Sequence, residues 1–158
     1  MIRVYIDTNI FLNVWNREID PKTKIELWKS SAQVLQLIEE EKVRGLTSLT
    51  TLMEIVHAFR RRRRNYEDAI RDLESLGIDI FVPNSFTLLR AFELQQDYGL
   101  DPYDSIALAV ALESNCDYLI TRDEDFAKKA SDLIKVCTPE WFLKENLCDE
   151  CKRKIFEE

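Results

Sequence analysis

The sequence predicts an α/β protein in which a central, mainly parallel sheet of about five strands is covered by helices on both faces. Short segments rich in β-branched and aromatic residues alternate with segments of helical periodicity, and few hairpin signals separate them. Strands joined in this way pair in parallel through right-handed crossovers, which place helices on both faces. The 158 residues are enough for one domain with a substantial core. We expect one three-layer domain over residues 1–147 and a charged C-terminal tail over residues 148–158.

The strands are predicted from short apolar runs that end at polar or turn-forming residues. The first run, residues 2–6, is rich in β-branched and aromatic residues, and Asp7 ends it. The run that follows Gly77 stops at a Pro-Asn pair, which is typical of turns. The five predicted strands are residues 2–6, 43–48, 78–82, 118–120 and 133–136.

The helices are predicted from apolar residues that recur every three to four positions. Gly77 and Gly99 follow two of these segments and favour the left-handed conformation that ends a helix. Residues 101–104, Asp-Pro-Tyr-Asp, have the pattern of a helix start, with the first Asp as N-cap. We assign no helix or strand between Asp7 and residue 22. The predicted helices are residues 22–42, 50–63, 66–76, 85–98, 105–113 and 123–130, and one that begins at Thr138.

Composition excludes several classes of protein. The chain is 46% hydrophobic and 32% charged, without low-complexity segments or repeats, as is typical of a folded globular domain. The N-terminus lacks the basic and apolar regions of a secretory signal, and no apolar run approaches the ~18–20 residues needed to span a bilayer. We therefore expect a cytoplasmic protein. Its formal charge of −7 means that a nucleic-acid-binding surface would need locally concentrated positive charge.

Four acidic residues occur where the predicted topology brings them to one edge of the sheet. Asp7 and Asp123 lie just after two strands, and open parallel sheets bind ligands beyond the carboxyl ends of their strands. Asp104 lies in the first turn of the helix that precedes the 118–120 strand. Glu54 lies near the start of the helix after the second strand. Together they form a candidate acidic site.

Each acid also has a purely structural explanation. Asp104 and Asp123 are placed as helix-start residues, where the helix dipole and free N–H groups favour carboxylates. An alternative interpretation of Glu54 is that it is a solvated helix residue, although its neighbours in the sequence are apolar. Asp7 is harder to explain in this way, because turn formation accounts for the Thr-Asn pair after it but not for an acid directly after Val-Tyr-Ile.

Converging carboxylates favour a divalent cation. They repel one another, and their pKa values rise unless a cation offsets the charge. Oxygen ligands without histidine or thiolate select Mg²⁺ or Mn²⁺ over zinc. Such ions suit phosphodiester hydrolysis, since they lower the pKa of a water, orient it and stabilise the leaving oxygen. The residues alone therefore predict metal-dependent phosphoryl chemistry without specifying the phosphoester.

Four segments resemble the sequence motifs of PIN domains, the nuclease family that includes the VapC-type toxins. Any one of these motifs alone is weak evidence, whereas four in the right order on the expected elements are strong evidence. Their order and spacing match over about residues 1–136, and the implied fold is PIN-like. The segments are Val-Tyr-Ile-Asp7-Thr8-Asn9-Ile-Phe, Thr-Leu-Met-Glu54-Ile, Leu100-Asp-Pro-Tyr-Asp104-Ser-Ile-Ala-Leu-Ala and Tyr118-Leu-Ile-Thr121-Arg-Asp123-Glu-Asp125-Phe126.

The resemblance implies a Mg²⁺- or Mn²⁺-dependent endoribonuclease that hydrolyses RNA phosphodiester bonds through a metal-activated water. By this resemblance, acids would ligate the metal directly or through water, and three polar residues would support them by hydrogen bonds. The expected ligands are Asp7, Glu54, Asp104 and Asp123, with Asp125 a less certain fifth, and the expected supporting residues are Thr8, Asn9 and Thr121.

The resemblance also implies partners. Members are commonly homodimers, and the toxins are neutralised by an antitoxin protein, so we expect RNA as substrate, a homodimer and an antitoxin. The chain is slightly longer at its end than the compact toxins, which leaves two alternatives open: a free-standing RNA-processing nuclease, and a non-catalytic module that binds RNA or protein. Other acid-edged α/β proteins fit less well. A phosphatase with an aspartyl nucleophile needs a second Asp where this chain has Asn9, and a response-regulator receiver needs a late Lys that does not fit here.

Five consecutive arginines, Arg60, Arg61, Arg62, Arg63 and Arg64, stand at the end of the predicted helix that carries Glu54. One interpretation is structural, since positive charge is favourable at a helix C-terminus. The other is an RNA-binding surface close to the acidic site. Consecutive helical residues point in every direction, so not all five can contact RNA.

The cysteines have several interpretations. Cys148 and Cys151 invite a zinc or redox role, but structural zinc needs four ligands. The remaining thiols, Cys116 and Cys137, are predicted at opposite ends of the sheet, so a local disulfide or free thiols are favoured.

The single histidine and the tryptophans are assigned mainly to structure. His57 is interpreted as a helix surface or packing residue rather than a catalytic base. Trp15, Trp28 and Trp141 are interpreted as core or dimer-interface anchors, with base stacking as an alternative for Trp15, because it lies near Asp7.

Overall fold

The sheet has five parallel strands in the order β3-β2-β1-β4-β5. The computed structural model describes residues 1–147; the predicted tail at 148–158, with Cys148 and Cys151, lies outside the described residues. The strand order changes direction at the central strand, so β1 has the second strand on one side and the fourth on the other. The strands are β1 (Arg3–Ile6), β2 (Arg44–Ser48), β3 (Asp79–Phe81), β4 (Tyr118–Ile120) and β5 (Lys135–Cys137).

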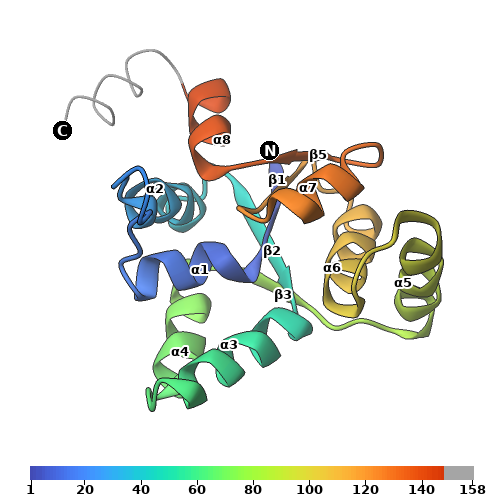
Figure 1. The fold of residues 1–158 in the computed structure, drawn as a ribbon, viewed down its shortest axis with the longest axis horizontal. Coiled ribbons are helices and arrows are strands. Elements are labelled where there is room, and N and C mark those ends of the chain that lie inside the picture. Colours follow the sequence, from blue (N-terminus) through green and yellow to red (C-terminus); the bar gives the residue numbers. More distant parts are fainter. Residues whose placement is uncertain (148–158) are drawn as a thin grey trace.

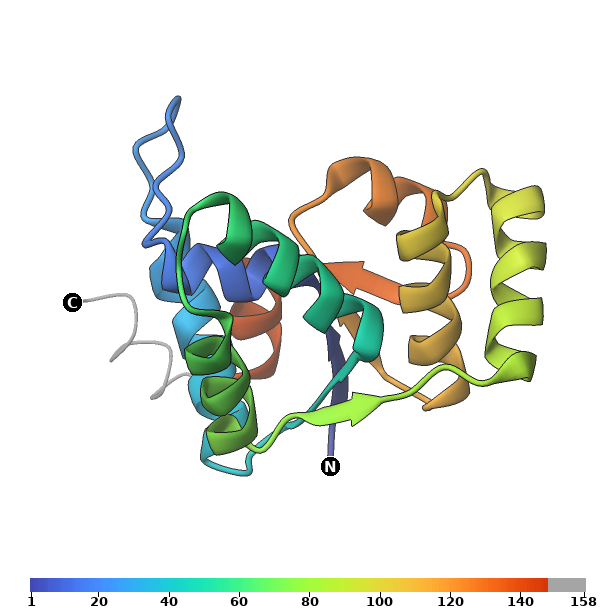
Figure 2. The ribbon, with the colours of Figure 1, turned by 90° about the horizontal axis from the view of Figure 1, so that it is seen from below.

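Helices cover both faces of the sheet, which confirms the predicted three-layer α/β/α fold (Figure 1; Figure 2). None of the helices within residues 1–147 is long and apolar enough to cross a membrane. One face carries α1 (Thr8–Trp15), α2 (Leu27–Glu39), α3 (Leu49–Arg61), α4 (Tyr66–Leu76) and α8 (Pro139–Asn146), and the other carries α5 (Ser85–Tyr98), α6 (Pro102–Glu113) and α7 (Glu124–Ala130).

The central strand β1 is buried on both faces. Val4 and Ile6 belong to the core beneath α1 to α4, and Tyr5 belongs to the core beneath α5 to α7. All three side chains are fully buried. The Tyr5 hydroxyl donates a hydrogen bond to Ser48 Oγ at 3.0 Å, and Ser48 is the N-cap of α3. The strand that ends at Asp7 therefore also fixes where α3 begins.

Most predicted elements are confirmed to within a few residues, but three predictions need correction. Residues 8–15 are helical, where no element was predicted: α1 begins directly after β1, and Asp7 is its N-cap. The predicted 22–42 helix begins only at Leu27, because residues 20–26 form an exposed loop that Ile19 and Glu26 close with an antiparallel bridge (Figure 2). The last strand lies at 135–137 instead of 133–136.

The predicted helix ends are confirmed. Gly77 and Gly99 have φ angles of 75° and 66°, which is the left-handed conformation that glycine adopts without strain. Asp101 caps α6, since its Oδ1 accepts the backbone N–H of Asp104 at 2.9 Å. Pro102 occupies the first helical position, as predicted.

The packing of β2 against α2 predicts that Gly45→Ala destabilises the fold. A Cβ at Gly45 would lie 2.5 Å from Ile38 Cδ1, so the α2 side chain would have to move. We expect a loss of about 1–3 kcal/mol in the free energy of unfolding, measured by urea denaturation. Adding Ile38→Val, which removes Cδ1, should recover part of that loss. A double variant that is less stable than the sum of the two single changes would contradict this account.

Candidate active site

A pocket of about 260 Å³ lies at the carboxyl ends of β1 and β4 and brings together the four predicted acids. It opens where the strand order reverses, the position at which open parallel sheets bind ligands. Figure 1 shows α1, α3, α6 and α7 around this end of the sheet. We call it the acidic pocket; its lining residues are Asp7, Thr8, Asn9, Leu12, Glu54, Asp101, Tyr103, Asp104 and Asp123.

Asp7 is the most buried of these acids, with 9% of its surface exposed. Its Oδ2 accepts hydrogen bonds from Thr121 Oγ1 at 2.6 Å and from Asn9 Nδ2 at 3.3 Å. Its Oδ1 accepts the backbone N–H of Thr8 at 2.9 Å. The carboxylate is therefore held in one orientation by groups from α1 and from the end of β4.

The three predicted supporting residues all contact acids of the pocket. Thr8 Oγ1 donates to Glu54 Oε1 at 3.0 Å, which links α1 to α3. Thr121 Oγ1 accepts the backbone N–H of Asp123 at 3.1 Å, besides donating to Asp7. Asn9 bonds Thr121 Oγ1 at 3.2 Å as well as Asp7. A single hydrogen-bonded network thus joins the three supporting residues with Asp7, Glu54 and Asp123.

Three of the pocket's acids cap helices and line the pocket at the same time, so the structural and the functional interpretations are compatible. Asp7, Asp101 and Asp123 are the N-caps of α1, α6 and α7. The positive ends of three helix dipoles therefore point into the same pocket and stabilise negative charge there. Capping explains how these carboxylates are held, and the topology explains why they meet.

The electrostatics of the pocket disfavour the full charge of its acids. Burial raises the pKa of Asp7, and it does so against the hydrogen bonds from Thr121 and Thr8. Burial, followed by the nearby charges of Asp7 and Asp101, raises the pKa of Glu54. The pKa of Asp104 rises from 3.8 to about 8, first through burial and then through the charges of Asp101, Asp7 and Asp123. The pocket holds more carboxylates than it can stably ionise without a counter-charge.

The donor set fits a hard divalent cation. The polar side chains of the lining supply carboxylate, hydroxyl and amide oxygens, and no histidine or cysteine contributes. Within residues 1–147, however, no three acidic, histidine or cysteine side chains already converge as a ready-made ligand group. Asp7 and Glu54 are instead engaged by Thr121 and Thr8. Side-chain rotation or intervening water would therefore accompany the binding of an ion.

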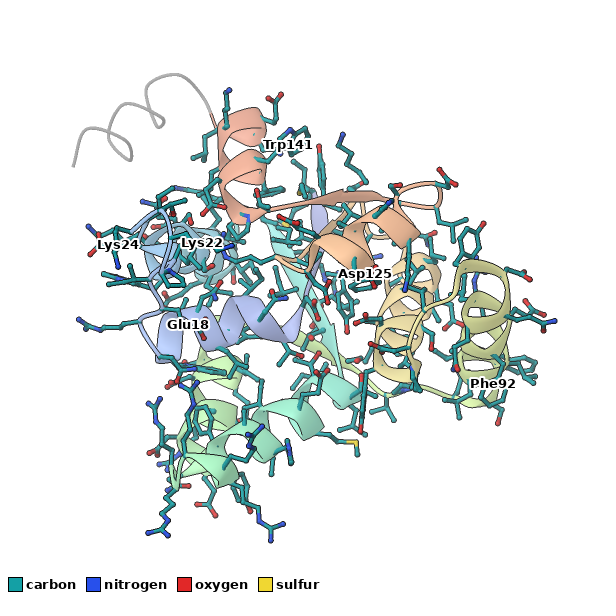
Figure 3. All side chains as sticks on the ribbon, viewed as in Figure 1. Glu18, Lys22, Lys24, Phe92, Asp125 and Trp141 are labelled. Atoms are coloured by element: carbon teal, nitrogen blue, oxygen red, sulfur yellow. The ribbon has the colours of Figure 1, made fainter. Side chains whose placement is uncertain are left out.

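Asp125, the less certain fifth acid, does not line the pocket. It lies on α7 (labelled in Figure 3), its side chain is 73% exposed, and it pairs with Lys129 at 2.9 Å. Trp15 packs between Phe11 and Phe59 at centroid distances of 5.7 and 5.6 Å, so it is a partly buried residue that packs against the core.

The arginine run divides into two parts. Arg64 is bound within the fold: its Nη1 donates to Trp15 O at 3.2 Å and to Asn16 Oδ1 at 3.0 Å. Its guanidinium also lies 4.9 Å from the centre of the Phe59 ring. The other four side chains, residues 60–63, are exposed. Arg64 is exposed as well, but its guanidinium is already engaged within the fold.

Two polar lining residues were not predicted as site residues. Asp101 was identified only as a helix cap, yet it lines the pocket and raises the pKa of Asp104 and Glu54. Tyr103 was part of a motif without a role of its own. The Asp-Pro-Tyr-Asp motif could have indicated both residues, because a helix that begins at the pocket brings its N-cap and part of its first turn to the pocket.

Arg122 is a third residue that sequence reasoning missed. Its side chain is 15% exposed and forms an ion pair with Glu140 of α8 at 2.8 Å. It also donates to Asn13 Oδ1 of α1 at 2.6 Å and to Leu27 O of α2 at 2.9 Å. Because Arg122 lies between Thr121 and Asp123, it anchors that segment to three helices.

The two described cysteines are free thiols. Cys137 is paired with Ile120 in register and lies at the carboxyl end of β5, whereas Cys116 precedes β4, so they lie at opposite ends of the sheet as predicted. Burial raises the pKa of Cys116 to about 11 and that of Cys137 to about 12, which makes both thiols unreactive at neutral pH.

Comparison with known proteins identifies the same family as the motifs. The model of the PIN domain family matches residues 4–132. A search of curated proteins finds no match.

Solved structures share the fold at low sequence identity. A toxin-antitoxin complex from Klebsiella pneumoniae is similar at 23% identity and a TM-score of 0.64, over 86% of this chain and 97% of that one. VapBC-1 from nontypeable Haemophilus influenzae is similar at 21% identity and a TM-score of 0.59, over 88% and 99%. VapBC2 from Rickettsia felis, bound to a DNA fragment from their promoter, is similar at 15% identity and a TM-score of 0.64, over 87% and 98%.

The contacts of Arg122 predict that Arg122→Ala is strongly destabilising. It would remove the ion-pair partner of Glu140, which keeps a hydrogen bond from Ser30, and one of the donors to Asn13 Oδ1, which keeps the one from Ser31. We expect a loss of about 2–4 kcal/mol in the free energy of unfolding, less than for a fully buried pair because Glu140 is partly exposed. Arg44→Ala is the matched control, since it breaks an exposed pair with Asp79 and should cost less than about 1 kcal/mol. Equal losses for the two variants in urea denaturation would refute this role.

The raised pKa of Asp104 predicts a pH-dependent effect of Asp104→Asn in chelator. The folded state binds this proton more tightly than the unfolded chain, so the contribution to stability is full below about pH 4 and is lost as pH rises towards 8. The variant cannot ionise. Its melting temperature should therefore exceed that of the wild type by a few degrees at pH 8, and the difference should shrink towards pH 5. A difference independent of pH would contradict the prediction.

Proposed function

Because the chain belongs to the PIN domain family, we propose that it is a divalent-metal-dependent endoribonuclease, the toxin of a VapBC-type toxin–antitoxin pair. Members of this family are nucleases. The observation that carries the proposal is the gathering of Asp7, Glu54, Asp104 and Asp123 around one pocket that offers oxygen donors only. The pKa values of the first three of these acids are raised. We assign Mg²⁺ or Mn²⁺ as the cofactor on the chemistry of this donor set.

The four acids would hold the cation, directly or through water. When bound, the cation lowers the pKa of the attacking water and stabilises the leaving oxygen of the phosphodiester. Thr121 keeps Asp7 Oδ2 in a fixed orientation, and Thr8 does the same for Glu54 Oε1. Burial and the neighbouring charges raise the pKa of Asp104 to about 8 in the absence of a cation, so binding of the cation would be accompanied by loss of that proton.

The partner assignments rest on the structural neighbours. One similar structure is described as a toxin–antitoxin complex, and two are described as VapBC, one of them bound to a DNA fragment from their promoter. By analogy we propose an antitoxin partner, RNA as substrate, assembly as a homodimer and a cytoplasmic location. The exposed arginines at 60–63 supply the local positive charge that an RNA-binding protein of net charge −7 requires.

The proposal predicts that Asp7→Asn abolishes RNA cleavage. Asparagine keeps the size of the side chain but removes a ligand charge, so we expect a fall of more than roughly 100-fold, beyond the loss typical of an outer-shell partner. Cleavage of structured and unstructured RNA would be measured with Mg²⁺, with Mn²⁺ and with chelator. Equal cleavage by both proteins, or cleavage that survives chelation, would show a contaminant and remove the nuclease proposal.

A further inference from the structure

A second cavity, of about 450 Å³, adjoins the acidic pocket along α3. It shares Thr8, Leu12, Glu54 and Tyr103 with the pocket, so the two form one continuous depression. The remaining lining residues are Met53, His57 and Ala58. Unlike the acidic pocket, this cavity has Glu54 as its only carboxylate.

The cavity exposes large side chains that do not serve the core. Met53 is 55% exposed and Tyr103 is 46% exposed. Neither belongs to the core clusters of the described residues. His57 is also exposed, and no hydrogen bond within residues 1–147 engages its imidazole or the Tyr103 hydroxyl. An aromatic face, a flexible thioether and a free imidazole thus border one hollow beside the acids.

The α3 helix carries an acid of the pocket, the imidazole of the cavity and an exposed arginine on one face. Residues three and four apart share a helix face, so Glu54, His57 and Arg61 follow one another on the same side. The rise of the helix separates the first from the last by about 10 Å. Along the axis of α3, Glu54 therefore lies at the acidic pocket, His57 lies at the second cavity, and Arg61 follows.

We propose that this cavity is a nucleobase subsite, which takes the unpaired base next to the phosphate bound at the acidic pocket. The inference rests on the proposed nuclease function, since it starts from an RNA phosphate at the acids. The ring of Tyr103 can stack on the base, and the thioether of Met53 can pack against it. The imidazole of His57 can form a hydrogen bond to the base edge. The next phosphate of the strand then approaches Arg61. A base in a paired helix cannot enter the cavity, so the subsite selects single-stranded RNA.

Another cavity near the pocket lacks these properties. It has a volume of about 260 Å³ and borders Asp123, which is the only residue it shares with the acidic pocket. Its aromatic residue, Trp141, is already covered by Lys135, whose Nζ lies 4.5 Å from the ring centre. The α3 cavity is therefore the better site for a base.

The test measures binding of short single-stranded RNAs that carry one abasic position, moved stepwise along the strand. Asp7→Asn serves as the background, so that the RNA stays intact, and Mg²⁺ is present throughout. Tyr103→Phe keeps the ring and Tyr103→Leu removes it. Phe92→Leu is the matched control, because Phe92 is 60% exposed and points away from the molecule on α5 (Figure 3). Melting temperatures confirm that each variant is folded.

The subsite predicts that one abasic position weakens binding by about 5- to 100-fold, the range for the loss of one stacked base. Tyr103→Leu should weaken the binding of intact RNA by a similar factor, and it should not weaken further the binding of the RNA that is abasic at that position. Tyr103→Phe and Phe92→Leu should bind both RNAs as tightly as the background protein does. Equal effects of all abasic positions, equal losses on intact and abasic RNA, or no RNA binding would overturn the subsite. Base-selective binding by a wild type that cleaves nothing would instead remove only the nuclease proposal.

Discussion

The hydrogen bond between Thr121 Oγ1 and Asp7 Oδ2, at 2.6 Å, is the contact on which the site depends. It joins the ends of β1 and β4 at the reversal of strand order and fixes the carboxylate with the least exposure to solvent. Asn9 and the N–H of Asp123 attach to the same hydroxyl, so the first and last motifs of the chain are held together by one oxygen. The core under β1 and the helices anchored by Arg122 keep that hydroxyl in place.

Around this contact the fold gathers more negative charge than it can stabilise alone. Three helix N-termini and several hydroxyls offset part of the repulsion, yet the pKa values of Asp7, Glu54 and Asp104 are all raised. Such an arrangement costs stability in the absence of a counter-ion, which a purely structural role would not explain. The divalent cation that we propose would offset this charge and would account for both the cost and the choice of residues.

The fold and the gathering of the four acids followed from the sequence, because strand ends and helix starts are set by local patterns. The helix after Asp7 did not, since Thr-Asn after a strand also suits a turn and only burial of Ile10 and Phe11 favours the helix. The surroundings of Asp125 and Arg122 could not be predicted from local sequence patterns either. Both stand in one short motif, but a helix of seven residues turns Asp125 towards Lys129 and solvent, and Arg122 finds partners on three distant helices.

The central claim is that the acidic pocket binds a divalent cation through its carboxylates. It is tested most directly by calorimetric titration of Mn²⁺ into the wild type, Asp104→Asn and Asp97→Asn, the last removing an equal charge from an exposed position on α5. We expect saturable binding by the wild type and by Asp97→Asn, and at least about tenfold weaker binding by Asp104→Asn. Equal affinities for all three proteins, or no saturable binding to the wild type, would contradict the account.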